Sequence, residues 1–159
     1  MDKHALLGRL IATLAQDHEV LLRAVQTARE AATHEESKAE NKYDTRGLEA
    51  SYLAHGQARR LEEIAQALQR FRALVVAPHA AELGIRTGDL VHLADGQGRE
   101  RWVFLGPDAA GLQGTCEAGP CLVITSQSPL GQALHGQGEG AEVKLAVGGG
   151  QHYEVLAVY

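Results

Sequence analysis

The chain has 159 residues, of which 45% are hydrophobic and 22% charged, a size and composition typical of one ordinary domain or two small ones. Its formal net charge of −5 argues against a protein that binds nucleic acid through a large excess of positive charge. No apolar run approaches the ~20 residues of a membrane helix. Two cysteines exclude a disulfide scaffold and a four-cysteine zinc site. The N-terminal segment lacks the features of a signal peptide, and we expect a cytoplasmic protein that does not bind membranes.

The composition changes near residue 77. Residues 1–76 contain no proline and three glycines, whereas residues 77–159 contain all four prolines and fifteen glycines. The first segment carries 11 basic and 11 acidic residues, and the second carries 4 and 9, so the net charge belongs to the second. Because Pro78 would end a helix, we expect one domain over residues 1–76 and another over residues 77–159.

Residues 1–76 have the apolar spacing of two helices. Steps of four and three define one stripe at Leu7, Ile11, Leu14, His18, Leu21, Val25, Ala28 and Ala32, and another at Gly47, Ala50, Ala54, Gln57, Leu61, Ile64, Leu68 and Phe71. Positions in the two stripes mirror one another about residue 39. The pattern predicts an antiparallel α-helical coiled-coil hairpin with arms of about 30 residues, or ~45 Å. Such a hairpin needs no partner chain, and we expect a monomer.

The predicted turn of this hairpin is rich in charge. Four carboxylates, those of Glu35, Glu36, Glu40 and Asp44, lie within ten residues and are interleaved with lysines. One interpretation is a solvated loop that caps two helix ends. The other is a carboxylate cluster that helps to hold a divalent cation such as Mg²⁺, which takes one or two carboxylates together with substrate oxygens.

Residues 77–159 alternate short β patterns with turns. We expect strands over residues 89–93, 101–105, 122–124, 142–147 and 153–159. We also expect a short helix over residues 129–134, with Ser128 as its cap and Pro129 as its first residue. The prediction is a small α+β domain with a twisted antiparallel sheet.

The segment Ile124-Thr125-Ser126-Gln127-Ser128-Pro129-Leu130-Gly131-Gln132-Ala133-Leu134-His135-Gly136 resembles the "SP-L/I-G-x-A-L-x-G" segment of the GreA/GreB transcript cleavage factors. Residues 84–91, 140–143 and 153–156 are similar to other strands of that family. The resemblance extends over nearly the whole chain and implies a coiled-coil hairpin followed by an FKBP-like α+β domain. It also implies a transcription elongation factor whose partner is bacterial RNA polymerase.

The resemblance further implies roles for individual residues. The loop with Ser126, Ser128 and Pro129 would dock on the polymerase while the hairpin enters the secondary channel. Acidic tip residues would help the polymerase to hold a second Mg²⁺ and a water that cleaves backtracked RNA, and the factor itself would not be an enzyme. The candidates for this role are Glu36 and Glu40, which would share the Mg²⁺ with the polymerase, and then Glu35. Basic side chains near the tip, those of Lys38, Lys42 and Arg46, would follow the nascent RNA 3′ end, unless they only pair with neighbouring acids.

The tip departs from the family pattern, in which two acids stand three residues apart. The residue three before Glu40 is Ser37, and the nearest acid, Glu36, is four before it. A misplacement of ~1 Å in such a site can lower a rate about a hundredfold. The spacing therefore leaves open a regulator that binds the polymerase channel without stimulating cleavage.

Two further functions and the state of the two cysteines follow from other features of the sequence. A prolyl isomerase would need an apolar aromatic pocket, and residues 77–159 have only Trp102, Phe104, Tyr153 and Tyr159 as aromatic residues. A coiled-coil adaptor with another partner is also consistent with the pattern. Cys116 and Cys121 are expected to be two reduced thiols rather than half of a zinc site.

Overall fold

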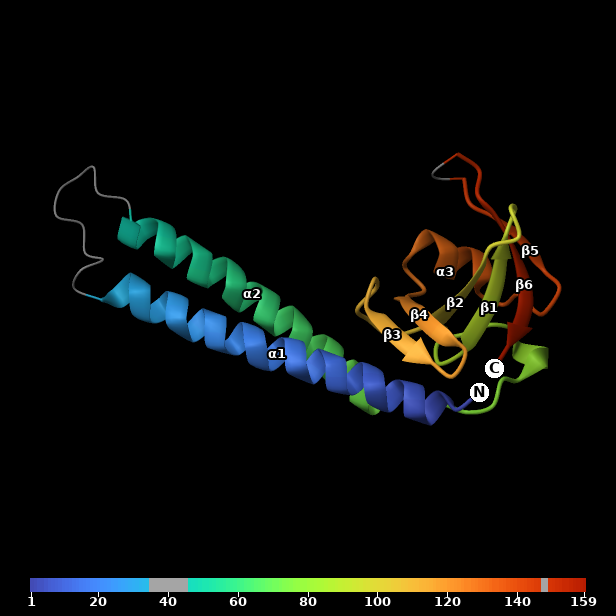
Figure 1. Cartoon of the computed structure of the whole chain (residues 1–159), viewed down its shortest axis with the longest axis horizontal. Helices are drawn as coiled ribbons and strands as arrows, with labels where there is room; N and C mark the ends of the chain where they lie inside the picture. Colours follow the sequence, from blue (N-terminus) through green and yellow to red (C-terminus); the bar gives the residue numbers. More distant parts are fainter. Residues whose placement is uncertain (35–45, 147–148) are drawn as a thin grey trace. The chain divides into compact units, whose positions relative to one another are not determined.

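The computed structural model describes residues 1–34, 46–146 and 149–159 (Figure 1). The chain forms two units. One, here the sheet unit, comprises Met1–Ala12 and Gln69–Tyr159, and the other, here the helical unit, is Thr13–Leu68. The outer ends of both long helices therefore group with the sheet, and the expected division between residues 76 and 77 stays a prediction.

Two long helices confirm the first part of the sequence pattern. α1 spans Lys3–Thr33 and α2 spans Arg46–Ala73. The α1 N-terminus is capped by Asp2, whose Oδ1 accepts a hydrogen bond of 2.9 Å from the Ala5 amide. This bond lowers the pKa of the Asp2 carboxyl. Within the described residues, neither helix nor any other is both long and apolar enough to cross a membrane.

The burial of side chains follows the expected stripes. On α1, Leu7, Leu14 and Val25 are buried and the stripe residues between them are half-buried. On α2, Ile64 and Leu68 are buried, and the stripe continues to a buried Phe71. Each helix therefore buries one of its own faces and exposes the other, as an amphipathic helix does. The winding of the two faces around one another as a coiled coil remains a prediction.

Within the described residues, the sheet has six strands in the order β3-β4-β2-β1-β6-β5. The strands are β1 Leu90–Asp95, β2 Glu100–Leu105, β3 Gln113–Cys116, β4 Gly119–Ile124, β5 Glu142–Lys144 and β6 His152–Val158. The α+β class is confirmed. The expectation of a purely antiparallel sheet is wrong, because β2 pairs with β4 in parallel. After β2 the chain skips one position in the sheet to form β3, and β4 then fills that position between β3 and β2.

The strand β3 is absent from the sequence prediction. Its sequence, Gln-Gly-Thr-Cys, lacks a β-rich alternating pattern, so tertiary packing decides its conformation. Gly114 lies directly against α1: a Cβ added at Gly114 would stand 2.7 Å from Leu10 Cδ2. A larger residue here would require the Leu10 side chain to shift, which is consistent with a glycine in the middle of a strand.

The core of the sheet unit lies on both faces of the sheet. On one face the helix α3, Pro129–Leu134, packs Leu134 against strand residues such as Val103 and Leu105 (Figure 1). Successive strand residues point to opposite faces, so Phe104 lies on the other face, where it is fully buried, as are Leu6, Leu10 and Phe71 of the helix ends. A 3-10 turn, η2 Ala81–Leu83, leads into Ile85, which exchanges backbone hydrogen bonds with Gly136 and Gln137 just after α3.

Candidate functional site

The loop of residues 125–129 joins the end of β4 to α3. Ser128 has an extended backbone conformation and caps the helix, because its Oγ accepts a hydrogen bond of 3.2 Å from the Gly131 amide. The same hydroxyl donates a hydrogen bond of 2.7 Å to the Thr125 carbonyl. Pro129 is the first helical residue, where its fixed φ is already helical. The expected cap and helix are thereby confirmed.

Gly131 locks this loop against the helix. A Cβ at Gly131 would overlap the Thr125 carbonyl oxygen, so no larger residue fits without moving the backbone. The Gln132 side chain adds a hydrogen bond of 3.3 Å from its Nε2 to the Gln127 carbonyl. Helix and loop therefore form one rigid element.

What the loop presents to solvent is small and polar. Ser126, Gln127 and Pro129 are exposed. Ser128 is half-buried, and its hydroxyl takes part in two hydrogen bonds. Ser126 and Pro129 are therefore accessible to a partner, and Ser128 holds the loop in place, while the role of all three in docking stays a prediction. A preformed loop loses little conformational entropy on binding, which suits docking to a partner.

The predicted tip residues Glu35, Glu36, Glu40, Lys38 and Lys42 lie outside the described residues. Arg46 is the first residue of α2, but its side chain is outside what the structure describes. Their roles stay predictions. Among the residues that are described, no group of three His, Cys, Asp or Glu side chains could hold a metal ion.

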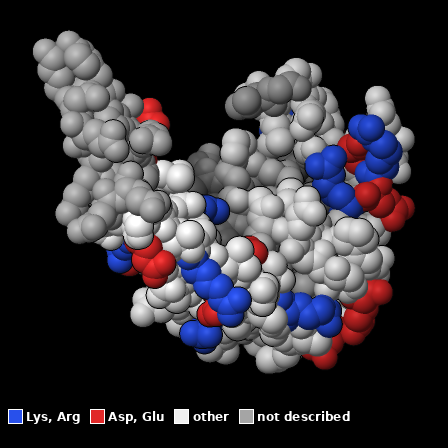
Figure 2. Space-filling model, turned by 60° about the vertical axis from the view of Figure 1, so that its left-hand side comes forward, with Lys and Arg blue, Asp and Glu red and all other residues white. Residues whose placement is uncertain are grey.

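Basic side chains farther along the helices pair with acids on their own helix. Arg23 Nη2 lies 2.9 Å from Glu19 Oε1, and Arg60 Nη1 lies 3.1 Å from Glu63 Oε2, which Arg59 also approaches. On the face in Figure 2, basic and acidic side chains likewise lie beside one another. Exposed pairs of this kind stabilise a helix only slightly, and these arginines fit the interpretation as a solvated face.

Sequence reasoning missed a buried charge cluster in the sheet unit. Asp89, 3% exposed, has its Oδ1 3.3 Å from Lys3 Nζ and its Oδ2 3.0 Å from His79 Nδ1. The Arg86 amide donates to the same Oδ2 at 3.0 Å. Lys3 and His79 are 86 and 10 residues from Asp89 in the sequence, so the spacing of residues along the chain does not reveal this cluster. The cluster joins the start of α1 to the residue before β1.

Cys116 and Cys121 are free, buried thiols on the β3–β4 hairpin. Burial raises the pKa of the Cys121 thiol to about 11, with the neighbouring Cys116 adding to the effect. A thiol of this kind is a poor nucleophile and metal ligand near neutral pH.

No family model matches the chain, and no curated protein matches it. Among solved structures, it is similar to the GreA factor homolog 1 (Gfh1) of Thermus thermophilus, with 25% identity, coverage of 94% of each chain and a TM-score of 0.39. It is also similar to Thermus aquaticus Gfh1, with 26% identity over 98% of this chain and 95% of that one, at a TM-score of 0.40. A GreA/GreB transcription elongation factor from Nitrosomonas europaea has 22% identity over 65% of this chain and 78% of that one, at a TM-score of 0.36.

Proposed function

We propose that this protein is a transcription elongation factor that binds bacterial RNA polymerase and places its helical hairpin in the secondary channel. The observation that carries the proposal is the segment of residues 124–136, whose sequence resembles the GreA/GreB segment. The geometry supports it because four residues of that segment each have a physical role. Ser128 caps the helix, Pro129 starts it, Gly131 admits the Thr125 carbonyl and Leu134 fills the core.

The docking element is the exposed part of the loop. Ser126 offers a hydroxyl and Pro129 a rigid apolar edge, both on a backbone fixed by the Ser128 hydrogen bonds. The loop has no charge of its own, so docking through it depends on shape and hydrogen bonds rather than on long-range attraction.

The tip would act on the RNA. Glu36 and Glu40, with Glu35 beside them, supply carboxylates toward a second Mg²⁺ that the polymerase holds jointly, and Lys38, Lys42 and Arg46 attract phosphates of the nascent RNA 3′ end. That ion, when bound, supplies activation of a water for hydrolysis of the RNA. The polymerase performs the reaction, and the factor is accessory and monomeric in this proposal.

A second candidate function is a channel-binding regulator without cleavage activity. The spacing of the acids favours it, because Glu36 and Glu40 are four residues apart where the family pattern has three. In that case the tip occludes the channel or alters initiation.

The test is a stalled, backtracked elongation complex of a bacterial RNA polymerase incubated with the protein and Mg²⁺. The expected result is shortening of the RNA from its 3′ end, abolished by Glu36→Ala and Glu40→Ala but unchanged by Glu19→Ala, a control that removes an exposed acid from α1. Polymerase binding should persist in all three variants.

Two outcomes separate the candidates. Binding without any shortening of the RNA, at any Mg²⁺ concentration, assigns the regulator. No binding to the polymerase overturns both functions and favours an adaptor with another partner.

A further inference from the structure

Two arginines at the start of β2 reach toward one pair of opposed residues on the sheet. The register places Asp95 of β1 directly opposite Tyr153 of β6. Arg99 Nε donates a hydrogen bond of 2.8 Å to Asp95 Oδ2, and Arg101 Cζ lies 5.0 Å from the centre of the Tyr153 ring. Arg101 pairs with Leu93, two residues before Asp95, so it points to the same side of the sheet. Two positive charges therefore gather over the Asp95–Tyr153 pair.

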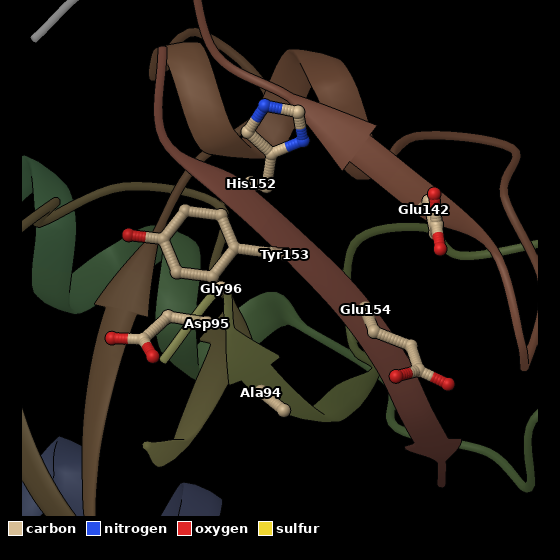
Figure 3. Close-up of a pocket in the computed structure, with 7 residues that line it drawn as sticks. All are labelled: Ala94, Asp95, Gly96, Glu142, His152, Tyr153 and Glu154. Atoms are coloured by element: carbon tan, nitrogen blue, oxygen red, sulfur yellow. The ribbon is translucent and has the colours of Figure 1, made fainter. Parts of the chain in front are cut away.

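The acids of the neighbouring strands point to the other side of the sheet. There the register sets three of them in one row with Ala94, namely Glu142, Glu154 and Glu100. Figure 3 shows Asp95 and Tyr153 extending to one side of their strands, and Ala94 and Glu154 to the other. The three glutamates therefore do not neutralise the two arginines by direct contact.

Asp95 and Tyr153 hold the two guanidinium groups in place. The Asp95 side chain is 10% exposed, and its Oδ1 accepts hydrogen bonds of 2.9 and 3.0 Å from the Gln97 and Arg99 amides. The bond from the Arg99 amide lowers the pKa of the Asp95 carboxyl, which keeps this group ionised. Tyr153 is buried, and its hydroxyl donates a hydrogen bond of 2.9 Å to Gln151 Oε1. Both groups that position the arginines are thus fixed themselves.

The outer ends of the guanidinium groups remain available to a ligand. Within the described residues, the Arg99 side chain bonds to Asp95 through Nε alone, and the Arg101 guanidinium has no ion pair or hydrogen bond. The Arg99 side chain is 72% exposed, and Arg101 is exposed. Both border a hollow of about 500 Å³ in which Asp95 is the one acid among the described lining residues, with Gln97 and Gln151 beside it. This volume lies in the range of sites for small molecules.

We propose that this hollow, here the arginine hollow, binds the phosphate group of a small phosphorylated molecule. Each guanidinium presents a planar fork of N–H donors, and a phosphate has enough oxygens for two forks, whereas one fork already satisfies a carboxylate. Asp95 compensates one of the two cations, so one positive charge is left for the ligand. The glutamine side chains and the glycine backbone of the lining suit a sugar better than an apolar group. This site is separate from the loop at α3 and goes beyond the proposed function.

The test uses the whole chain and titrates it with ADP, adenosine and inorganic phosphate in a calorimeter. ADP should bind with a Kd of about 1 mM or lower, and adenosine, which lacks phosphate, should not bind. Arg101→Gln should raise the Kd of ADP by about tenfold or more. Arg86→Gln is the matched control, because Arg86 is an exposed arginine of the same unit outside the hollow, and it should change the Kd by less than about twofold.

Two further measurements sharpen the test. Asp95→Asn removes a negative charge but also the group that positions Arg99, so it should weaken ADP binding several-fold. The ratio of the Kd values for phosphate and ADP distinguishes the source of the ligand. Tighter binding of ADP supports a phosphorylated molecule, and equal binding supports the same site with free phosphate as its ligand. The fluorescence of Trp102, the single tryptophan, verifies that each variant is folded.

Four results would overturn the proposal. The first is no binding of ADP or phosphate at about 1 mM, or equal binding of adenosine. The second is an unchanged Kd in Arg101→Gln. The third is equal weakening by Arg86→Gln or stronger binding in Asp95→Asn, either of which would mean net charge alone. The fourth is binding of a ten-nucleotide uridine RNA that is tighter than that of ADP and that Arg101→Gln weakens, which would assign a nucleic-acid surface instead.

Discussion

The helical unit and the sheet unit are stabilised in different ways. In the described part of Thr13–Leu68, the buried hydrophobic residues are Leu14, Val25, Ile64, Ala67 and Leu68, one narrow stripe on each helix. The sheet unit buries the other described core residues, on both faces of a six-stranded sheet, together with the Lys3–Asp89–His79 cluster. Most of the described buried apolar side chains therefore lie in the sheet unit, which also contains the loop of residues 125–129 that we propose for docking.

Truncation of a core side chain should distinguish the two units most strongly. Phe71→Ala removes a fully buried ring from the sheet unit and should lower the free energy of unfolding by about 3–5 kcal/mol. Val25→Ala removes a smaller side chain from the helical unit. In urea, Phe71→Ala should shift the transition reported by Trp102 fluorescence, whereas Val25→Ala should shift mainly the helical circular dichroism signal. Equal shifts of the Trp102 transition would mean that the two units unfold as one.

The buried charge cluster is the next most sensitive point. Asp89→Asn leaves Lys3, itself 7% exposed, without its compensating charge and should lower the free energy of unfolding by about 3 kcal/mol. Thermal or urea unfolding measures this loss, with Glu82→Gln, at an exposed acid of η2, as the control. The control should change the free energy of unfolding by no more than about 0.5 kcal/mol. A loss no larger than that of the control would show that the cluster contributes little to the sheet unit.

The close approach at α3 is expected to matter somewhat less for stability and more for docking. Gly131→Val forces the helix away from the Thr125 carbonyl and should cost about 2–3 kcal/mol. Gly138→Ala, at a glycine with open space around it and no left-handed backbone, is the matched control and should be nearly neutral. Urea unfolding compares the two. Nearly equal midpoints would contradict the tight contact.

The smallest effect concerns Cys121. Because its pKa in the folded chain is about 11 against an ordinary value of 9.0, its thiolate fraction at pH 9 should be roughly 50-fold lower than that of a free thiol, and alkylation correspondingly slow. The thiol is held neutral when folded, so its stabilising contribution is fully present below pH 9 and is lost as pH rises from 9 toward 11. Urea unfolding across this range should be less pH-dependent in Cys121→Ala. Rapid alkylation of the folded chain at pH 9 would contradict the assignment.

The sequence predicted the parts of the fold that depend on local patterns. The apolar steps from Leu7 to Val25 and from Leu61 to Phe71 identified both helices, and the Ser128-Pro129 pair identified the start of α3. The parallel pairing of β2 with β4 could not be predicted, because the sequence of β3 has no strand pattern and so does not reveal the β3–β4 hairpin that brings β4 beside β2. Local spacing could not reveal the Asp89 cluster either, since folding alone brings Lys3 to Asp89.

Site residues that lie in one sequence motif could be predicted, whereas residues that only the fold brings together could not. The loop residues Ser126, Ser128 and Pro129 stand in a sequence motif whose caps have known geometry, and the structure reproduces that geometry. By contrast, Glu142, Glu154 and Glu100 come from three strands, and only the register of the sheet brings them into one row, which no local pattern predicts.

Docking through the loop at α3 can be measured as equilibrium binding of the labelled protein to a bacterial RNA polymerase, with variants at the two ends of β4. Ser126→Arg places a bulky charge on the docking loop, and Ala118→Arg places the same charge on the exposed turn at the other end of the strand. We predict saturable binding that Ser126→Arg weakens at least about tenfold and Ala118→Arg leaves unchanged. No binding of the parent protein, or equal effects of the two variants, would contradict docking through this loop.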